Sequence, residues 1–112
     1  MEFPQDQIEE LRSLYPGVSK CDEGGATFFL IPQLAMPDGC DPPSADALLS
    51  PTPRGDGYPS RLYLASQIAT PTQRNWNGNI RILERNWHAC SWKVNVTLRL
   101  VQQVAAHLKA FR

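Results

Sequence analysis

Cys90 and Ser91 stand side by side in a stretch, residues 73–95 (QRNWNGNIRILERNWHACSWKVN), that also holds His88 and all three tryptophans. A cysteine attacks as its thiolate, and nearby cations such as Lys93 lower the pKa of a thiol. A serine becomes a nucleophile when a general base, here His88, accepts its proton. We therefore take Cys90, Ser91 and His88 as candidate catalytic residues for covalent chemistry.

Each of these residues also has a structural interpretation. A free cysteine is often a small buried hydrophobe, and a histidine between aromatic residues is often a hydrogen-bonded part of the fold. Ser91 is equally a polar loop residue. Cys21 and Cys40 have no histidine near them in the sequence, so Cys90 is the preferred nucleophile and Ser91 its rival.

The same stretch is rich in side-chain amides, which can hold a developing negative charge. Gln73, Asn75 and Asn79 are candidates for such an oxyanion site or for the wall of a groove. Asn77 is followed by Gly78, and this dipeptide is typical of a tight hairpin turn. We therefore assign Asn77 to a turn.

Composition excludes several classes of function. The formal net charge is zero and no run of Lys or Arg occurs, which argues against nucleic acid as a partner. No apolar run approaches the roughly 20 residues of a membrane span, and the acidic N-terminus is unlike a signal peptide. The three cysteines are an odd number, and their spacing predicts neither a disulfide scaffold nor a metal site. We expect a cytoplasmic protein without cofactors.

The elements that must position these residues follow from periodicity and turn signals. The chain of 112 residues predicts one domain, residues 1–112. Helical spacing predicts a helix over 4–15, which Pro16 and Gly17 end. Apolar runs between turn residues predict strands over 18–21, 26–34, 45–50 and 61–68, with Pro-rich loops at 37–44 and 51–60.

The clearest helix is predicted over residues 97–111, with Asn95 or Thr97 as its cap. We expect Arg99, Gln102, Gln103 and Lys109 to face away from the core, and His107 to face solvent. Its apolar stripe consists of Leu98, Val101, Val104, Ala105, Leu108 and Phe111. The fold class is therefore α+β: an N-terminal helix, a sheet of three or four antiparallel strands, an irregular segment and a C-terminal helix.

Three segments together resemble a known superfamily. Residues 8–18 (IEELRSLYPGV) resemble the opening helix of RWD-type domains. Residues 48–64 (LLSPTPRGDGYPSRLYL) and 75–83 (NWNGNIRIL), followed by tryptophans and a helix, resemble the ubiquitin-conjugating superfamily. The closest resemblance is to a bacterial ubiquitin-conjugating-enzyme-like family, prokaryotic family E of the UBC/RWD superfamily.

This resemblance implies a UBC/RWD-like fold and a ubiquitin-like-protein transferase. Such an enzyme accepts the activated carboxyl of a ubiquitin-like protein, as a thioester at Cys90 or an oxyester at Ser91, and passes it to a target. The implied partners are the ubiquitin-like protein, its activating enzyme and a metalloprotease of the same gene cluster. The implied setting is a bacterial ubiquitination-like pathway in anti-phage defence.

The sequence also departs from the family pattern. When Gly78-Asn79-Ile80 is aligned with the matching residues of the family's active-site segment, Arg81 stands where the family has its cysteine. The asparagine of the family's His-Pro-Asn falls at Gln73, so the resemblance implies that Arg81 and Gln73 line the groove beside the nucleophile. A second interpretation is therefore a non-catalytic UBC/RWD-like adaptor that binds the activating enzyme or the ubiquitin-like protein.

Overall fold

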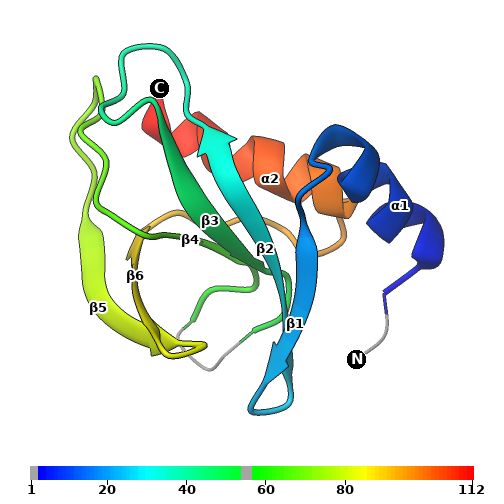
Figure 1. The fold of residues 1–112 in the computed structure, drawn as a ribbon. Helices are drawn as coiled ribbons and strands as arrows, with labels where there is room; N and C mark the ends of the chain where they lie inside the picture. Colours follow the sequence, from blue (N-terminus) through cyan, green and yellow to red (C-terminus); the bar gives the residue numbers. More distant parts are fainter. Residues whose placement is uncertain (1–2, 54–56) are drawn as a thin grey trace.

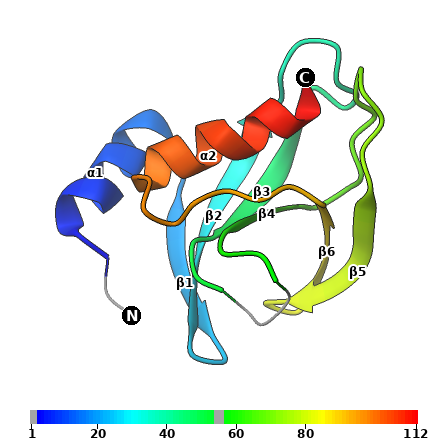
Figure 2. The same cartoon turned by 180° about the vertical axis from the view of Figure 1, so that it is seen from behind.

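The computed structural model describes residues 3–53 and 57–112, which form two helices, six strands and a short C-terminal 3-10 helix. The two helices lie on one face of the sheet (Figures 1 and 2). Among the described residues, none of the helices has the length and apolar character that a membrane crossing requires. The elements are α1 (Gln5–Leu14), β1 (Ser19–Glu23), β2 (Ala26–Ala35), β3 (Ser44–Ser50), β4 (Arg61–Leu64), β5 (Trp76–Ile82), β6 (Arg85–Cys90), α2 (Leu100–Leu108) and η1 (Lys109–Phe111).

The sheet is antiparallel, with its strands in the order β1-β2-β3-β4-β6-β5. This arrangement confirms the predicted α+β class, but it has more than the three or four strands expected from the sequence. The two further strands come from residues 73–95, where the prediction of an irregular segment is wrong. β4 also ends at Leu64 rather than at residue 68, and residues 54–56 of the expected loop lie outside the described residues.

Both faces of the central strands are covered by apolar side chains. Leu49 and Phe29 face the main core, which lies beneath the helices. Leu48 and Phe28, their neighbours in the chain, face a second core. The β5–β6 hairpin covers this second face with Trp87, whose indole Nε1 donates to the carbonyl of Ile82 at 3.0 Å. The sheet therefore curls around the second core, because apolar side chains on both faces of β2 and β3 have to be buried.

The turn between β5 and β6 is formed by Leu83 and Glu84, and not by the Asn77-Gly78 dipeptide. Leu83 and Glu84 have φ angles of 52° and 62°, the left-handed pair that a tight hairpin turn requires. The Leu83 N–H also donates to Glu23 Oε2 at 3.0 Å, which ties the turn to the end of β1. The prediction of a turn at Asn77 is therefore wrong, since tertiary contacts of the hairpin outweigh the local turn preference.

Helix α2 starts at Leu100, so the predicted start at residue 97 and the predicted caps are wrong. Gln102 Oε1 accepts a hydrogen bond from the Arg99 N–H at 2.9 Å, and Gln7 Oε1 of α1 accepts one from the Leu100 N–H at 3.2 Å. Asn95 instead accepts from the Thr97 N–H, in a turn ahead of the helix. A side chain from α1 thus satisfies an N–H group that the helix itself leaves unpaired.

The buried face of α2 differs from the predicted stripe. Val104 and Phe111 are buried as expected, but Ala105 is exposed, and Gln103 is buried although we expected it to face away. His107 is only 4% exposed, so its predicted orientation toward solvent is also wrong. The helix is rotated because these two polar side chains find hydrogen-bond partners under it, which removes the cost of burying them.

Candidate functional site

The β5–β6 hairpin carries most of the residues that the sequence singled out. Successive side chains of a strand point to opposite faces. Trp87 and Ala89 accordingly belong to the second core, while Cys90 belongs to the main core. His88 pairs with Leu64 of β4 and lies on the same face as Cys90. The strand therefore directs Cys90 inward, toward the helices.

A β-bulge lies opposite His88. The register of β5 and β6 shifts between Asn77 and Ile80, so Gly78 and Asn79 together oppose one residue of β6. Asn79 has a left-handed φ of 57°. A Cβ on Gly78 would lie 2.9 Å from His88 Nδ1, so the imidazole packs directly on the glycine backbone. The structure thus brings His88 and Asn79 together.

His88 is half-buried, and its two ring nitrogens have different surroundings. Nδ1 is buried and has no hydrogen-bond partner among the described residues. A buried polar nitrogen without a partner costs free energy. The His88 ring is therefore positioned by its packing on Gly78 and not by a hydrogen bond from Nδ1.

Cys90 is poorly suited to be a nucleophile in this conformation. Its side chain is 7% exposed and packs in the main core. Burial raises the pKa of the Cys90 thiol, while its own backbone and the charges of Arg74 and Arg61 lower it by less. The thiol form is therefore favoured at neutral pH, whereas attack requires the thiolate.

Ser91 is the exposed member of the pair. It follows the end of β6, and its backbone N–H donates to the carbonyl of Asn75 at 2.9 Å. Among the described residues no hydrogen bond joins its hydroxyl to His88, which lies three residues earlier in the strand. Ser91 is thus accessible to a partner, but the structure does not place a base beside it.

The two groove candidates from the resemblance, Arg81 and Gln73, lie apart from Cys90. Arg81 is exposed on the edge strand β5, and its Nη1 donates across the hairpin to Asn86 Oδ1 at 3.4 Å. Gln73 is exposed on the segment that precedes β5. The structure therefore places Arg81 on an open surface and Cys90 beneath the helices.

The other two thiols are half-buried and have no histidine hydrogen-bonded to them among the described residues. Cys21 lies in the edge strand β1. The Cys40 thiol donates to the carbonyl of Phe111 at 3.1 Å, and burial raises its pKa. Within residues 3–53 and 57–112, no cluster of three or more His, Cys, Asp or Glu could hold a metal ion.

A buried polar cluster under α2 was missed by the sequence analysis. Ser60 Oγ lies 2.9 Å from Gln103 Oε1 and 3.0 Å from His107 Nε2. Ser60 is fully buried. Burial and the nearby charge of Arg61 lower the pKa of His107 to about 4. A serine in contact with a histidine is also part of the Ser-His-Asp catalytic triad of other proteins. Here α2 covers both residues, so their hydrogen bonds hold α2 on the sheet.

Arg61 links this cluster to the hairpin. It is 6% exposed, and its guanidinium lies 4.0 Å from the centre of the Tyr58 ring and 5.9 Å from that of Tyr63. Its Nη2 donates to Asn77 Oδ1 at 2.6 Å, which explains why Asn77 lies within β5 rather than in a turn. The positive charge of Arg61 is thus stabilised by the faces of two tyrosine rings and by the amide oxygen of Asn77.

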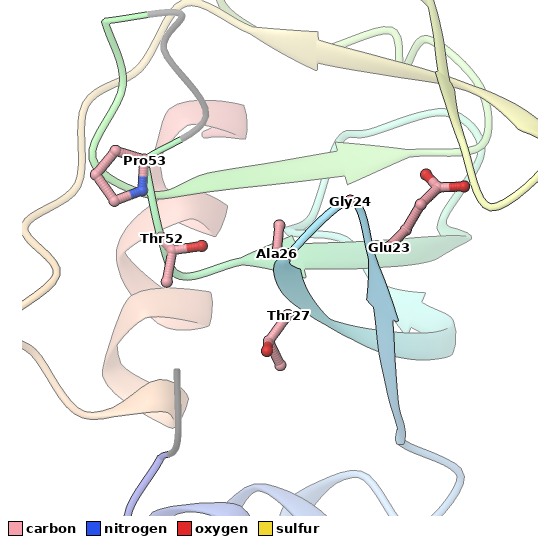
Figure 3. Close-up of a pocket in the computed structure, with 7 residues that line it drawn as sticks. Glu23, Gly24, Ala26, Thr27, Thr52 and Pro53 are labelled. Atoms are coloured by element: carbon pink, nitrogen blue, oxygen red, sulfur yellow. The ribbon is translucent and has the colours of Figure 1, made fainter.

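An open hollow of about 600 Å³ lies at the β1–β2 turn, away from these residues. Figure 3 shows Thr52 and Pro53 on one side of it, with Gly24 and Ala26 of the turn on the other. Among the described residues that line it, Glu23 is the one ionisable residue. These described lining residues include no cysteine, serine or histidine, so they offer a surface for contact.

Comparison with family models, with curated proteins and with solved structures gave no match to this chain. What the geometry defines is therefore the class alone: an α+β domain whose β5–β6 hairpin exposes Arg81 and Asn79, holds His88 half-buried and buries its one cysteine.

Proposed function

We propose that this domain is a non-catalytic binding module of the UBC/RWD type. In this role it docks a ubiquitin-like protein or its activating enzyme without forming a thioester. The burial of Cys90 carries the proposal, because a thiol inside the core with a raised pKa cannot meet the carboxyl of a large partner. The α+β architecture with both helices on one face is compatible with this class.

The exposed hairpin supports the same proposal. Arg81 stands where the resemblance puts the nucleophile, and its guanidinium reaches solvent from an edge strand. A guanidinium binds carboxylates by hydrogen bonds and charge but forms no ester. A surface of this kind therefore favours non-covalent recognition over transfer.

Thiol reactivity tests the proposal directly. The native protein is treated with iodoacetamide, and alkylation at each cysteine is followed by mass spectrometry. We expect Cys21 to react first and Cys90 to react more than about tenfold slower, because local opening must precede its alkylation. Denatured protein, in which the three thiols are equivalent, is the control. Faster reaction at Cys90 than at Cys21 would overturn the proposal.

Binding is tested with the ubiquitin-like protein and activating enzyme of a bacterial conjugation gene cluster. We expect a complex that survives gel filtration, and no covalent adduct after ATP is added and the mixture is run on a non-reducing gel. The absence of any complex with either partner contradicts the docking role. A reducible adduct that is lost in Cys90→Ala establishes the thioester transferase instead.

The exposure of Ser91 favours one second candidate, a transferase that forms an oxyester. Its adduct would resist reductant and be cleaved by mild base, since an oxyester is not a disulfide or a thioester. The adduct should be lost in Ser91→Ala and retained in Ser66→Ala, which removes another exposed serine. An adduct retained in Ser91→Ala excludes this candidate.

A further inference from the structure

Charge is distributed unevenly along a chain whose net charge is zero. Residues 57–112 contain eight Lys or Arg and one acidic residue, Glu84. Residues 3–53 contain eight Asp or Glu and two cations, Arg12 and Lys20. α1 and β1–β3 come from the first part, and the β5–β6 hairpin and α2 from the second (Figure 1). The two parts meet in ion pairs, because Arg85 contacts Asp46 at 3.3 Å and Arg99 contacts Asp6 and Glu10 at 2.8 and 3.0 Å. Arg61 is buried, so the cations of the second part outside these contacts are Arg74, Arg81, Lys93, Lys109 and Arg112.

Several of these cations gather at the C-terminal end of α2. The Arg74 side chain donates from Nε to the carbonyl of Ala110, and its guanidinium lies 5.1 Å from the centre of the Trp92 ring. Trp92 Nε1 donates to the carbonyl of Ala106 at 3.0 Å. Figure 2 shows the end of α2 close to the segment that leads into β5. The helix end, Arg74 and Trp92 are thus one continuous surface.

Three further cations flank these contacts in the sequence. Lys93 follows Trp92, and Lys109 and Arg112 lie on either side of Ala110. All three are exposed, and in the described part of the chain none of them forms an ion pair. We call Arg74, Lys93, Lys109 and Arg112, together with Trp92, the basic helix end.

We propose that the basic helix end binds an acidic protein segment. The proposal rests on the proposed docking function, and it names the surface and the chemistry of the partner. Arg74 on the Trp92 ring, with three exposed cations that neighbour Trp92 and Ala110 in the sequence, provides charge complementarity to carboxylates. The indole of Trp92 provides an apolar surface for side-chain stems. Arg74, held in place by Ala110 and Trp92, is preorganised and so loses little rotamer freedom on binding.

The arrangement of the aromatic rings favours a protein over a nucleic acid. Single-stranded nucleic acid binds by stacking bases on open aromatic faces. Trp92 already carries Arg74 on its ring, and Trp76 is stacked on Phe111 with ring centres 5.8 Å apart.

A fluorescein-labelled peptide of alternating Glu and Gly is the probe, read by fluorescence anisotropy at about 50 mM salt, where surface charges are weakly screened. We expect binding to weaken by about tenfold in the Lys93→Glu/Lys109→Glu variant, which reverses two charges. The matched control is Arg12→Glu/Lys20→Glu, which reverses the two exposed cations of the acidic part. Equal weakening in both variants, or no binding by the wild type, overturns the proposal.

Indole N–H resonances locate the peptide on the surface. We expect the Trp92 resonance to shift on titration and the Trp87 resonance to stay in place, because Trp87 is buried in the second core. Shifts of Trp87 as large as those of Trp92 would contradict the assigned surface. Tighter binding by a single-stranded RNA of equal charge would assign the surface to nucleic acid instead.

The same variant separates this proposal from the proposed function. A ubiquitin-like protein or activating enzyme that binds the wild type and the Lys93→Glu/Lys109→Glu variant equally leaves the docking function intact and refutes the basic helix end as its site. A complex lost in this variant and kept in Arg12→Glu/Lys20→Glu supports both.

Discussion

The hydrogen-bond partners of His107 determine its tautomer. Gln103 Nε2 donates to the carbonyl of Leu98 at 3.0 Å, so the amide presents its oxygen to Ser60. The single hydroxyl proton of Ser60 is donated to that oxygen, and Ser60 Oγ must therefore accept from His107 Nε2–H. The neutral ring of His107 is thus the Nε2–H tautomer, and burial lowers its pKa to about 4, so the ring is neutral at pH 7.

This buried histidine makes stability depend on pH. In the unfolded chain His107 binds a proton below about pH 6.5, whereas in the folded protein it does so below about pH 4. The free energy of unfolding should therefore fall as the pH drops from about 6.5 to 4, by about 3 kcal/mol in total, and level off below. Urea unfolding at a series of pH values measures this.

The control for this prediction is His107→Gln, which keeps a polar side chain of similar size and removes the titration. The difference in free energy of unfolding between wild type and variant should shrink or change sign toward pH 4. A difference that is the same at pH 7 and pH 4 would show that His107 titrates equally in both states.

The contact between Gly78 and His88 makes a second prediction at the level of single residues. Gly78→Ala would place a methyl group 2.9 Å from His88 Nδ1 and should destabilise the fold by about 1–3 kcal/mol. Combining it with His88→Ala should restore part of this loss, because the clashing ring is gone. Gly17→Ala, whose methyl would lie 3.6 Å from Pro32, is the neutral control. Thermal unfolding of five proteins measures this: the wild type, Gly78→Ala, His88→Ala, their combination and Gly17→Ala. Additive effects of Gly78→Ala and His88→Ala would contradict the prediction.

At the level of elements, the turn of the β5–β6 hairpin has a strained backbone conformation. Leu83 and Glu84 are both left-handed, which glycine and asparagine adopt with less strain than other residues. Burial of Ile82 and Trp87 on either side of the turn offsets this strain. The hairpin is therefore determined by its packing on β2–β4, and its turn sequence contributes little.

Relief of this strain should stabilise the protein. Glu84→Gly removes an exposed side chain from a residue with φ of 62° and should raise the free energy of unfolding by about 1 kcal/mol. Asn86→Gly, two residues further along in β6, should lower it by about 0.5–1 kcal/mol, since the strand residue gains flexibility and loses the side chain that accepts from Arg81. Chemical denaturation distinguishes the two, and a loss of stability in Glu84→Gly would argue against strain in the turn.

For the whole molecule, the two cores share one sheet and should unfold together. Leu48 and Leu49 are adjacent, fully buried and directed to opposite cores. Leu48→Ala and Leu49→Ala should each cost about 2–5 kcal/mol. In each variant tryptophan fluorescence and far-UV circular dichroism should report one coincident transition. Two separate transitions would show that the hairpin and its core fold independently of the rest.

Local patterns predicted the first half of the fold well. The helix ended by Pro16 and the strands predicted from the apolar runs of β2 and β3 fall within two residues of their predicted limits. Each of these segments has a regular spacing of apolar residues and is bounded by turn residues. The hairpin was missed because its turn, Leu83-Glu84, carries no turn residue, while Asn77-Gly78 shows a turn signal inside a strand.

The sequence by itself determined the α+β class and the order of the first elements. It also showed that the candidate catalytic residues cluster in positions 73–95. Which of them reach the surface was decided only by the tertiary structure. Pairing of His88 with Leu64 sets the register of β6, and with it the burial of Cys90. The hydrogen bonds of Ser60 turn His107 inward. Such contacts join residues far apart in the chain, and no local period encodes them.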